Sequence, residues 1–403
     1  MSRILLSSFV LATGCGAPGG PETTAGGTTS IESGTDFGSG EDPGTTTSDE
    51  GESTGTPGSA GSSSGGESSG SESGTGAPAG CGEGSAMAAE GVWSDGNTIV
   101  ICGAGFGERT HQAGPDLLED FSDFRHAEGE TVRSGEGQVF DGNTTFAYTN
   151  AAEPRFAGDV GQIVALGDAF IGNPNGELGG TAAPPAIDRI YGRFWKRFEI
   201  GPYEVENSAS HKFVRLWSGD EEDLRISWTQ MHLTVSNGNA GFPSAEVSWR
   251  AWEGDPTGWN LYEMLVDLET HTVHAWLNGE LVHAIVDADR IVDGASGLRF
   301  AHIASFDTAH GTPEVTGQRH WTEEVYVDRS PARVVVGGFE HWSERGAGGS
   351  STPLLEEIQR PTSWSDDRIE IVARLGALGS FRGRYLYVID DTGSVVNEDG
   401  LPI

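Results

Sequence analysis

Residues 191–200 alternate between two kinds of side chain. The odd positions carry the aromatic and charged residues Tyr191, Arg193, Trp195, Arg197 and Glu199. The even positions include Phe194, Phe198 and Ile200. Because neighbouring side chains of a β-strand point to opposite faces, the rings and cations share one face here. Cations buried without partners would lose solvation energy, so we expect a solvated cleft on this face.

Other segments add groups that could act in the same cleft. Trp228, Gln230 and His232 share one strand face by the same alternation. Rings in such a cleft can stack on sugar rings, while charged and amide groups hold hydroxyl groups and carboxylates. As ligand-binding residues we single out Tyr191, Trp195, Arg197, Lys212, Trp228 and Glu263. The alternative for each is a packing role, such as an arginine lying against a tryptophan.

Proton transfer is a second chemistry open to these residues. It needs a base whose pKa lies near the working pH and a cationic or amide partner within hydrogen-bond reach. In β-elimination on a uronate, the carboxylate would be neutralised by Arg193, Arg215 or Gln230. The proton would be exchanged by His211, His232 or Tyr262. If catalysis occurs, these six side chains should converge in one open groove.

Short strands must position these groups. The candidate segments are rich in β-branched and aromatic residues and are separated by Gly, Asn, Asp and Pro turns. They are Ile190–Ile200, Lys212–Trp217, Leu224–Val235, Glu246–Trp252, Leu261–Leu268, Thr272–Leu277, Leu281–Val286, Leu298–Phe306 and Thr322–Val327. Asn278-Gly279 between two of them is a strong hairpin signal.

Many short strands with almost no helical periodicity predict an all-β fold, an antiparallel β-sandwich. We expect the sandwich to cover residues 81–328. The strand pattern restarts at Ala332–Val336 and continues to Ile389, which predicts a small C-terminal β-domain over residues 329–403. The alternative is that these later strands close the first sandwich.

The amino terminus has the pattern of a secretory leader. A short basic start at Arg3 precedes an apolar run and then Ala12-Thr13-Gly14-Cys15. This end resembles a bacterial lipobox, which implies a signal peptide over residues 1–15, lipidation of Cys15 and location at the outer membrane or cell surface. The alternative is an ordinary cleavage site beside Cys15. Residues 16–80 are Gly, Ser, Thr and acid, and predict a disordered tether that reaches roughly 40 to 50 Å.

If Cys15 is acylated, two of the three cysteines remain. Cys81 and Cys102 then form an even pair in an oxidising compartment, which predicts a disulfide. Two free thiols are the alternative.

Charge excludes one class of partner. The chain has 60 acidic and 24 basic residues and a formal net charge of -36. Such a surface repels phosphate backbones, so we expect no nucleic-acid partner.

Four segments carry a resemblance to a known family. They are residues 191–199, residues 211–215, Trp259-Asn-Leu-Tyr-Glu and Val273-His-Ala-Trp-Leu-Asn-Gly-Glu. They resemble the concanavalin A-like lectin/glucanase jelly roll, and most of all its polysaccharide-lyase branch. The resemblance implies a jelly-roll topology with glycan held on a concave sheet face. Gln230-Met231-His232 also has the Gln-x-His form of an alginate-lyase family, although that family's accompanying signatures are missing.

The glucanase pattern of the same fold is absent. It needs Glu-x-Asp-x-Glu, whereas this chain has Leu265-Val-Asp267-Leu-Glu269. For metals, Asp220–Asp223 and Asp390-Asp391 lack the spacing of a calcium loop. We therefore expect no metal site and no cofactor beyond, at most, structural calcium.

These observations lead to three hypotheses. The first is a lipid-anchored surface protein that binds polysaccharide in a concave groove. The second is a lyase that cleaves a uronate-containing glycan. The third is a structural or adhesive surface protein without a sugar ligand.

Overall fold

The computed structural model describes residue 81 and residues 86–109, 114–121, 146–149, 154–156, 162–166, 169–171, 188–199, 212–218, 224–229, 232–236, 246–250, 255, 257–288, 291, 298–306 and 319–403. All of them belong to one compact unit, Ser73–Ile403. The predicted tether and three predicted functional residues, Cys15, His211 and Gln230, lie outside the described residues. Lys212 lies in a described strand, but its side chain is not described.

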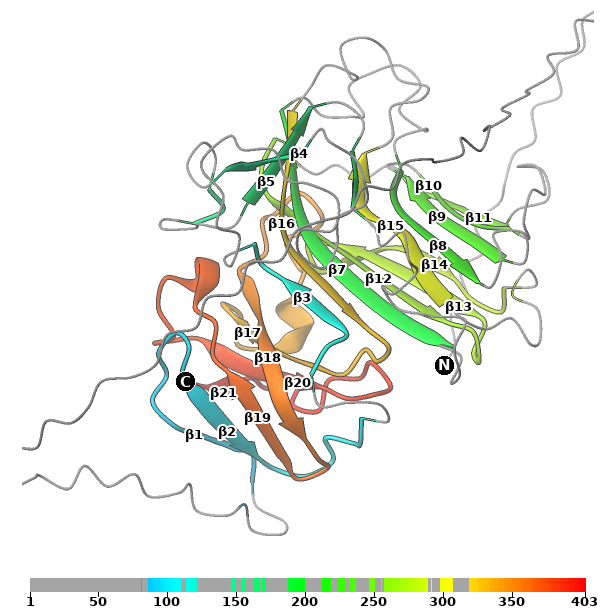
Figure 1. Ribbon diagram of the computed structural model, residues 1–403. Helices are drawn as coiled ribbons and strands as arrows, with labels where there is room; N and C mark the ends of the chain where they lie inside the picture. Colours follow the sequence, from blue (N-terminus) through cyan, green and yellow to red (C-terminus); the bar gives the residue numbers. More distant parts are fainter. Residues whose placement is uncertain are drawn as a thin grey trace, which may run out of the picture. The chain divides into compact units, whose positions relative to one another are not determined.

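The described residues form three antiparallel sheets, so the all-β prediction is confirmed (Figure 1). The largest has eight strands, seven of them in one path and β3 (Leu117–Glu119) paired with β16. The path runs β14 (Glu280–Ile285), β13 (Thr272–Leu277), β12 (Asn260–Asp267), β7 (Arg189–Phe198), β16 (Arg319–Asp328), β5 (Gln162–Leu166) and β4 (Phe146–Thr149).

A six-stranded sheet lies against one face of the eight-stranded sheet. Its order is β11 (Glu246–Trp249), β10 (His232–Ser236), β9 (Leu224–Thr229), β8 (Lys212–Ser218), β15 (Leu298–Phe306) and β6 (Ala169–Ile171). Side chains from both sheets, among them Phe194, Phe213, Trp228 and Tyr262, form one buried core. This is the predicted sandwich, while its jelly-roll topology stays a prediction.

The third sheet has seven strands and includes both ends of the described chain. Its order is β1 (Ala88–Glu90), β2 (Thr98–Cys102), β19 (Arg368–Val372), β18 (Glu356–Trp364), β17 (Arg333–Gly337), β20 (Tyr385–Ile389) and β21 (Leu401–Pro402). Two 3-10 turns, η4 (Trp342–Glu344) and η5 (Gly376–Leu378), connect its strands. One face of this sheet packs on its own apolar cluster around Ile99, Val334 and Ile371.

This topology corrects the predicted domain boundaries. Strands β1 and β2, which we assigned to the sandwich, pair instead within the sheet of the C-terminal domain, where Ile101 lies opposite Ile369. Strands β17 to β21 do not close the sandwich either, because they belong to this separate sheet. The partners in a sheet can lie far apart in sequence, so a linear change in composition does not locate the boundary.

Two local predictions are confirmed. A disulfide joins Cys81 to Cys102 at the end of β2, with 5.3 Å between their Cα atoms. Asn278 and Gly279 connect β13 to β14 with φ values of 50° and 82°. Both residues therefore take the left-handed backbone that a tight two-residue hairpin requires.

Candidate functional site

The predicted face of β7 exists, but solvent does not reach its part from Tyr191 to Trp195. Tyr191, Arg193 and Trp195 point away from Phe194 and Phe198, as the alternation predicts, yet their exposed fractions are only 1%, 0% and 2%. Tyr191 instead packs with Tyr326, Val335 and other residues in a cluster shared with the seven-stranded sheet. The prediction of a solvated cleft here is therefore wrong, because the C-terminal sheet covers this face.

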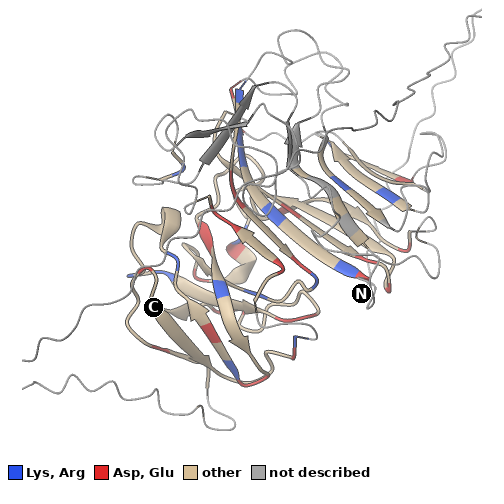
Figure 2. Cartoon of the chain, viewed as in Figure 1, with Lys and Arg blue, Asp and Glu red and all other residues tan. Residues whose placement is uncertain are grey.

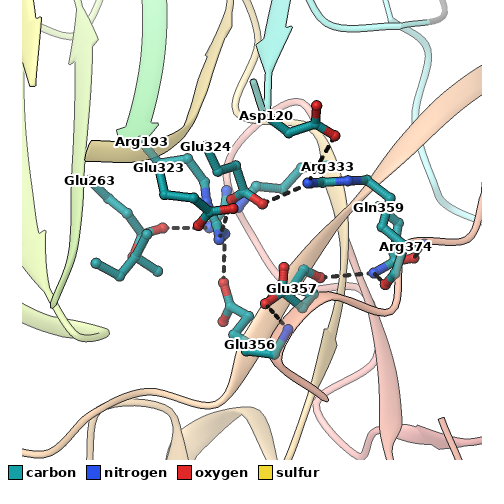
Figure 3. A network of polar contacts seen from close by, with 12 residues as sticks. Asp120, Arg193, Glu263, Glu323, Glu324, Arg333, Glu356, Glu357, Gln359 and Arg374 are labelled. Carbon is teal, nitrogen blue, oxygen red and sulfur yellow. Dashed lines mark hydrogen bonds and ion pairs between the residues drawn. The ribbon is translucent and has the colours of Figure 1, made fainter. Parts of the chain in front are cut away.

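Arg193 is held by acidic partners from both sheets (Figure 3). Its two terminal nitrogens donate to Glu356 Oε1 at 2.8 Å and to Glu324 Oε1 at 3.2 Å. Glu356 lies in the seven-stranded sheet, so this contact joins the two layers. A guanidinium with two buried carboxylate partners has little capacity left for a ligand.

Glu263, a predicted ligand-binding residue, belongs to the same interior. It accepts from Arg345 Nη2 at 2.5 Å and from the Tyr191 hydroxyl at 2.5 Å. Burial opposes its charge, but Arg345, Arg333 and Arg193 outweigh that penalty and hold its pKa well below the ordinary value. The carboxylate stays ionised and serves the contact between sheets.

These contacts are part of a wider ionic network, which we define by five buried glutamates and five arginines among the described residues. They are Glu263, Glu323, Glu324, Glu356 and Glu357 with Arg155, Arg193, Arg333, Arg345 and Arg374. Figure 2 shows acidic and basic segments gathered where β3, β7, β16 and β18 approach one another. Each of these glutamates faces at least one arginine, which compensates its buried charge.

A β-bulge brings two adjacent glutamates into this network. The register between β16 and β7 shifts between Glu323 and Val325, and Glu324 has a φ of 48°. Glu323 pairs with Arg155, whereas Glu324 pairs with Arg193 and Arg374. In a regular strand these neighbours would point to opposite faces, so the bulge is what lets both meet arginines.

Tyr262 lies on the opposite face of β12 from Glu263. It is fully buried in the sandwich core, where its ring stacks on Phe194 with centroids 5.1 Å apart and lies 5.5 Å from Trp228. Trp228 is equally buried. Neither can line an open groove, so their predicted roles in ligand binding or proton exchange are wrong.

The predicted alternation of Trp228 with His232 is also wrong. We expected one strand over Leu224–Val235, but the chain reverses between β9 and β10, and Leu233 lies opposite Trp228. Thr229 Oγ1 lies 2.9 Å from His232 Nδ1, and its hydroxyl donates to the His232 carbonyl at 3.1 Å. These contacts stabilise the reversal. His232 is thereby directed toward β11 instead of the core.

The predicted catalytic set does not converge. Arg193 lies between the eight-stranded and seven-stranded sheets, whereas Tyr262 lies inside the sandwich. Arg215 is half-buried on β8. Arg197, which we predicted to bind ligand, is half-buried over the Trp321 ring at 5.1 Å. The described members are thus distributed over separate parts of the fold.

A different residue presents an aromatic surface to solvent. Trp249, at the end of β11, has an exposed fraction of 57%. Its ring lies 4.6 Å from the His232 ring, centroid to centroid, because the two residues are directly opposite in the β10–β11 pair. A half-covered indole on an edge strand is a platform on which a flat apolar ligand face can pack.

Polar contacts tie this platform to edge strand β14. Ser248 Oγ lies 3.1 Å from His283 Nδ1, and Arg250 Nη1 donates to the Leu281 carbonyl at 3.0 Å. Arg250 also pairs with Glu280. We call this surface the edge site, formed by His232, Ser248, Trp249, Arg250, Glu280, Leu281 and His283.

The edge site carries little net charge near neutral pH. Burial, and then the nearby His232 and Arg250, lower the pKa of His283 to about 4. Burial also lowers the pKa of His232. Both imidazoles are therefore neutral at pH 7, and the Arg250 charge is balanced by Glu280.

Sequence reasoning missed the edge site. Trp249 falls within a predicted strand, and nothing in its neighbours distinguishes it from the other tryptophans of the chain. The contact between β11 and β14 joins residues about thirty positions apart and forms only when the two sheets stack.

Two kinds of feature are absent from the described residues. Among them, no helix is long and apolar enough to cross a membrane. Within the same residues, no group of three or more His, Cys, Asp or Glu side chains is placed to hold a metal ion.

Comparison with known proteins adds no family. No protein-family model matches the chain, and no curated protein matches it. Among solved structures, the binding domain of botulinum neurotoxin DC in complex with rat synaptotagmin II is 10% identical, with a TM-score of 0.26, over 50% of this chain and 42% of that chain. The receptor binding domain of botulinum neurotoxin mosaic serotype C/D is 11% identical, with a TM-score of 0.28, over 54% and 47%. The chain spans less than half the length of these structures, and TM-scores this low do not establish a shared fold.

Proposed function

We propose that the protein is a carbohydrate-binding module that holds polysaccharide at the edge site. One observation carries the proposal. The exposed large apolar side chains among the described residues are Val92, Trp249, Leu281 and Val286, and Trp249 is the aromatic one. Its indole keeps more than half of its surface in water, where burial against a ligand would be favourable.

The surroundings of Trp249 suit a sugar. The apolar C–H face of a sugar ring can pack on the indole, while its hydroxyl groups can exchange hydrogen bonds with polar groups beside it. Arg250 follows Trp249 directly in the chain with its side chain 44% exposed, and its partner Glu280 is 25% exposed. The exposed apolar surface is one ring and a partly exposed Leu281, whereas a stable protein partner needs about 800 Å² on each side.

Binding is favoured over β-elimination. Elimination needs a carboxylate-neutralising group and a proton-exchanging group in contact with the same sugar unit. Arg193 and Tyr262, one candidate for each role, lie on different faces of the eight-stranded sheet and are both fully buried. His232 is buried beside Trp249 with an exposed fraction of 6%, and Thr229 and that ring are among its contacts.

Location follows from the sequence. The leader ending at Cys15 supports a secreted protein that is lipid-anchored at the outer membrane or cell surface. Residues 16–80 would then act as the tether that holds the edge site away from lipid headgroups. The resemblance to concanavalin A-like proteins belongs to the same proposal and supports a glycan as partner.

Affinity gel electrophoresis of the purified full-length protein tests the proposal. We expect gels that contain a recognised polysaccharide to retard the protein, and Trp249→Ala to weaken that binding by about tenfold or more, because a central tryptophan typically contributes roughly 2 kcal/mol. Trp249→Phe should retain part of the retardation, since a smaller ring still stacks.

The matched control is Val92→Ala, which removes an exposed apolar side chain, 74% exposed, from the segment that joins β1 to β2. It should leave retardation unchanged. Absence of retardation by every neutral and acidic polysaccharide would overturn the proposal and favour a structural role without a sugar ligand.

A further inference from the structure

Several arginines around the sandwich are paired with carboxylates, which bears on the kind of glycan that the protein can take. Recognition of a uronate requires a cation that can approach the sugar carboxylate. Arg193 is held by Glu324 and Glu356, and Arg189 by Asp267 at 2.8 Å. Arg319 pairs with Glu199 at 2.8 Å.

At the edge site the described cation is Arg250, and its charge is also compensated. One of its terminal nitrogens pairs with Glu280 and the other donates to the Leu281 carbonyl. The arginine side chain is 44% exposed and the glutamate side chain 25% exposed, so an approaching ligand meets both charges together. A uronate would be attracted by one group and repelled by the other.

Glu280 is fixed in this position by a second contact. Its Oε2 accepts from the backbone N–H of Ser350, while Oε1 faces Arg250. The carboxylate is therefore anchored between the sandwich edge and the loop that precedes β18 and cannot easily swing away from Arg250. The acidity of the whole chain, with a net charge of -36, adds a long-range repulsion of polyanions.

We propose that the edge site takes a neutral glycan, a polymer of uncharged sugar units, and that Glu280 excludes uronate polymers by neutralising Arg250. This inference rests on the proposed function and adds the ligand class and the residue that determines it. Stacking on Trp249 supplies the attraction, and the neutral His232 imidazole beside the ring adds no positive charge at pH 7.

The test compares neutral and acidic polymers with the full-length protein. Affinity gels contain β-glucan, xylan or galactomannan as neutral polymers, and alginate or polygalacturonate as acidic ones, each at low and high salt. We expect retardation by at least one neutral polymer that changes less than twofold with salt, because stacking is not screened. We expect no retardation by the acidic polymers.

Glu280→Gln isolates the proposed exclusion. The amide keeps the shape and can still accept from Ser350 N, but it leaves the Arg250 charge uncompensated. We expect this variant to gain retardation in alginate or polygalacturonate that disappears at high salt, while binding to the neutral polymer stays within about twofold. Adding Arg250→Gln should remove the gain.

The matched control is Glu199→Gln, which makes the same change in net charge by breaking an exposed arginine pair elsewhere. It should gain no binding to acidic polymers. Circular dichroism and thermal melting establish that each variant is folded.

The outcomes separate the two proposals. If no polymer of either class retards the protein, the carbohydrate-binding function itself fails. If acidic polymers retard the unsubstituted protein more than neutral ones, that function stands and the neutral-glycan inference is wrong. If Glu280→Gln gains nothing, or gains no more than Glu199→Gln, Glu280 does not determine the ligand class.

Discussion

At the scale of single residues, the same side-chain types serve opposite purposes in this protein. Arg193 and Arg250 both carry a guanidinium paired with glutamate, but Arg193 is fully buried and Arg250 is exposed. The buried one stabilises contact between sheets, because its charge is fully compensated by Glu324 and Glu356. For the exposed Arg250, we propose that its pairing with Glu280 determines which class of glycan the edge site binds.

Loss of Arg193 should therefore be a folding defect. Arg193→Met removes a cation and leaves two buried carboxylates with less compensation, which typically costs about 3 to 5 kcal/mol of unfolding free energy. Denaturant titration of the purified protein measures this loss. Arg319→Met, which breaks the exposed pair with Glu199, should change stability by no more than about 0.5 kcal/mol. Equal effects of the two substitutions would contradict the structural role of the ionic network.

At the scale of elements, the contact between β11 and β14 should lose stability in acid. Ser248 on β11 contacts His283 on β14, and the His283 side chain is neutral because burial lowers its pKa to about 4. The groups that face it include His232 and Arg250, whose charges oppose its protonation. The Trp228 ring also packs edge-on against the His283 ring, with 6.2 Å between the two ring centroids.

This arrangement predicts how stability depends on pH. The pKa of His283 is near 6.5 in an unfolded chain and about 4 in the folded one, so below pH 6.5 the unfolded state binds the proton first. The folded state then loses stability as pH falls from about 6.5 to 4, by up to about 3 kcal/mol from this group.

Denaturant titrations at several pH values measure the effect. His283→Gln keeps a polar group next to Ser248 but cannot titrate, so the decline between pH 6.5 and 4.5 should become shallower in this variant. Glu263 and Glu324 lose their stabilising contribution mainly below that window, because the same carboxylates in an unfolded chain bind protons only near their ordinary pKa of 4.5. An unchanged slope in the variant would refute the assignment to His283.

At the scale of the whole molecule, the sandwich and the seven-stranded sheet depend on each other. The outer face of β7 and β12 presents Tyr191, Arg193 and Glu263, whose partners Glu356 and Arg345 come from the last quarter of the chain. Strand β2 pairs with β19, so the amino-terminal strands also lose their partner without that segment. Neither part has a complete set of neighbours alone.

A truncation tests this dependence. Deleting residues 329–403 should abolish cooperative folding, because it exposes the buried half of the ionic network and the apolar cluster around Tyr191. Thermal melting and limited proteolysis report the outcome. A chain that begins at Ser73 is the control, since it keeps the compact unit Ser73–Ile403 complete and should melt cooperatively. A stable fragment ending at residue 328 would show that the sandwich is independent.

The sequence by itself determined the strand-rich class, most strand positions, the hairpin at Asn278-Gly279 and the Cys81–Cys102 pair. It also determined which side chains of β7 share a face, because alternation is a local property of extended backbone. It missed the chain reversal between Thr229 and His232, because these residues include no Gly, Pro, Asn or Asp to mark a turn.

Only the tertiary structure decided what covers each face. A polar strand face looks the same in sequence whether water or a set of ion-pair partners lies over it. Arg193 meets Glu356 across 163 residues, and a β-bulge at Glu324 is needed to bring its other partner into place. Such partners meet only when one sheet packs on another. We therefore assign the candidate site to the edge at Trp249 and not to β7, where the sequence predicted it.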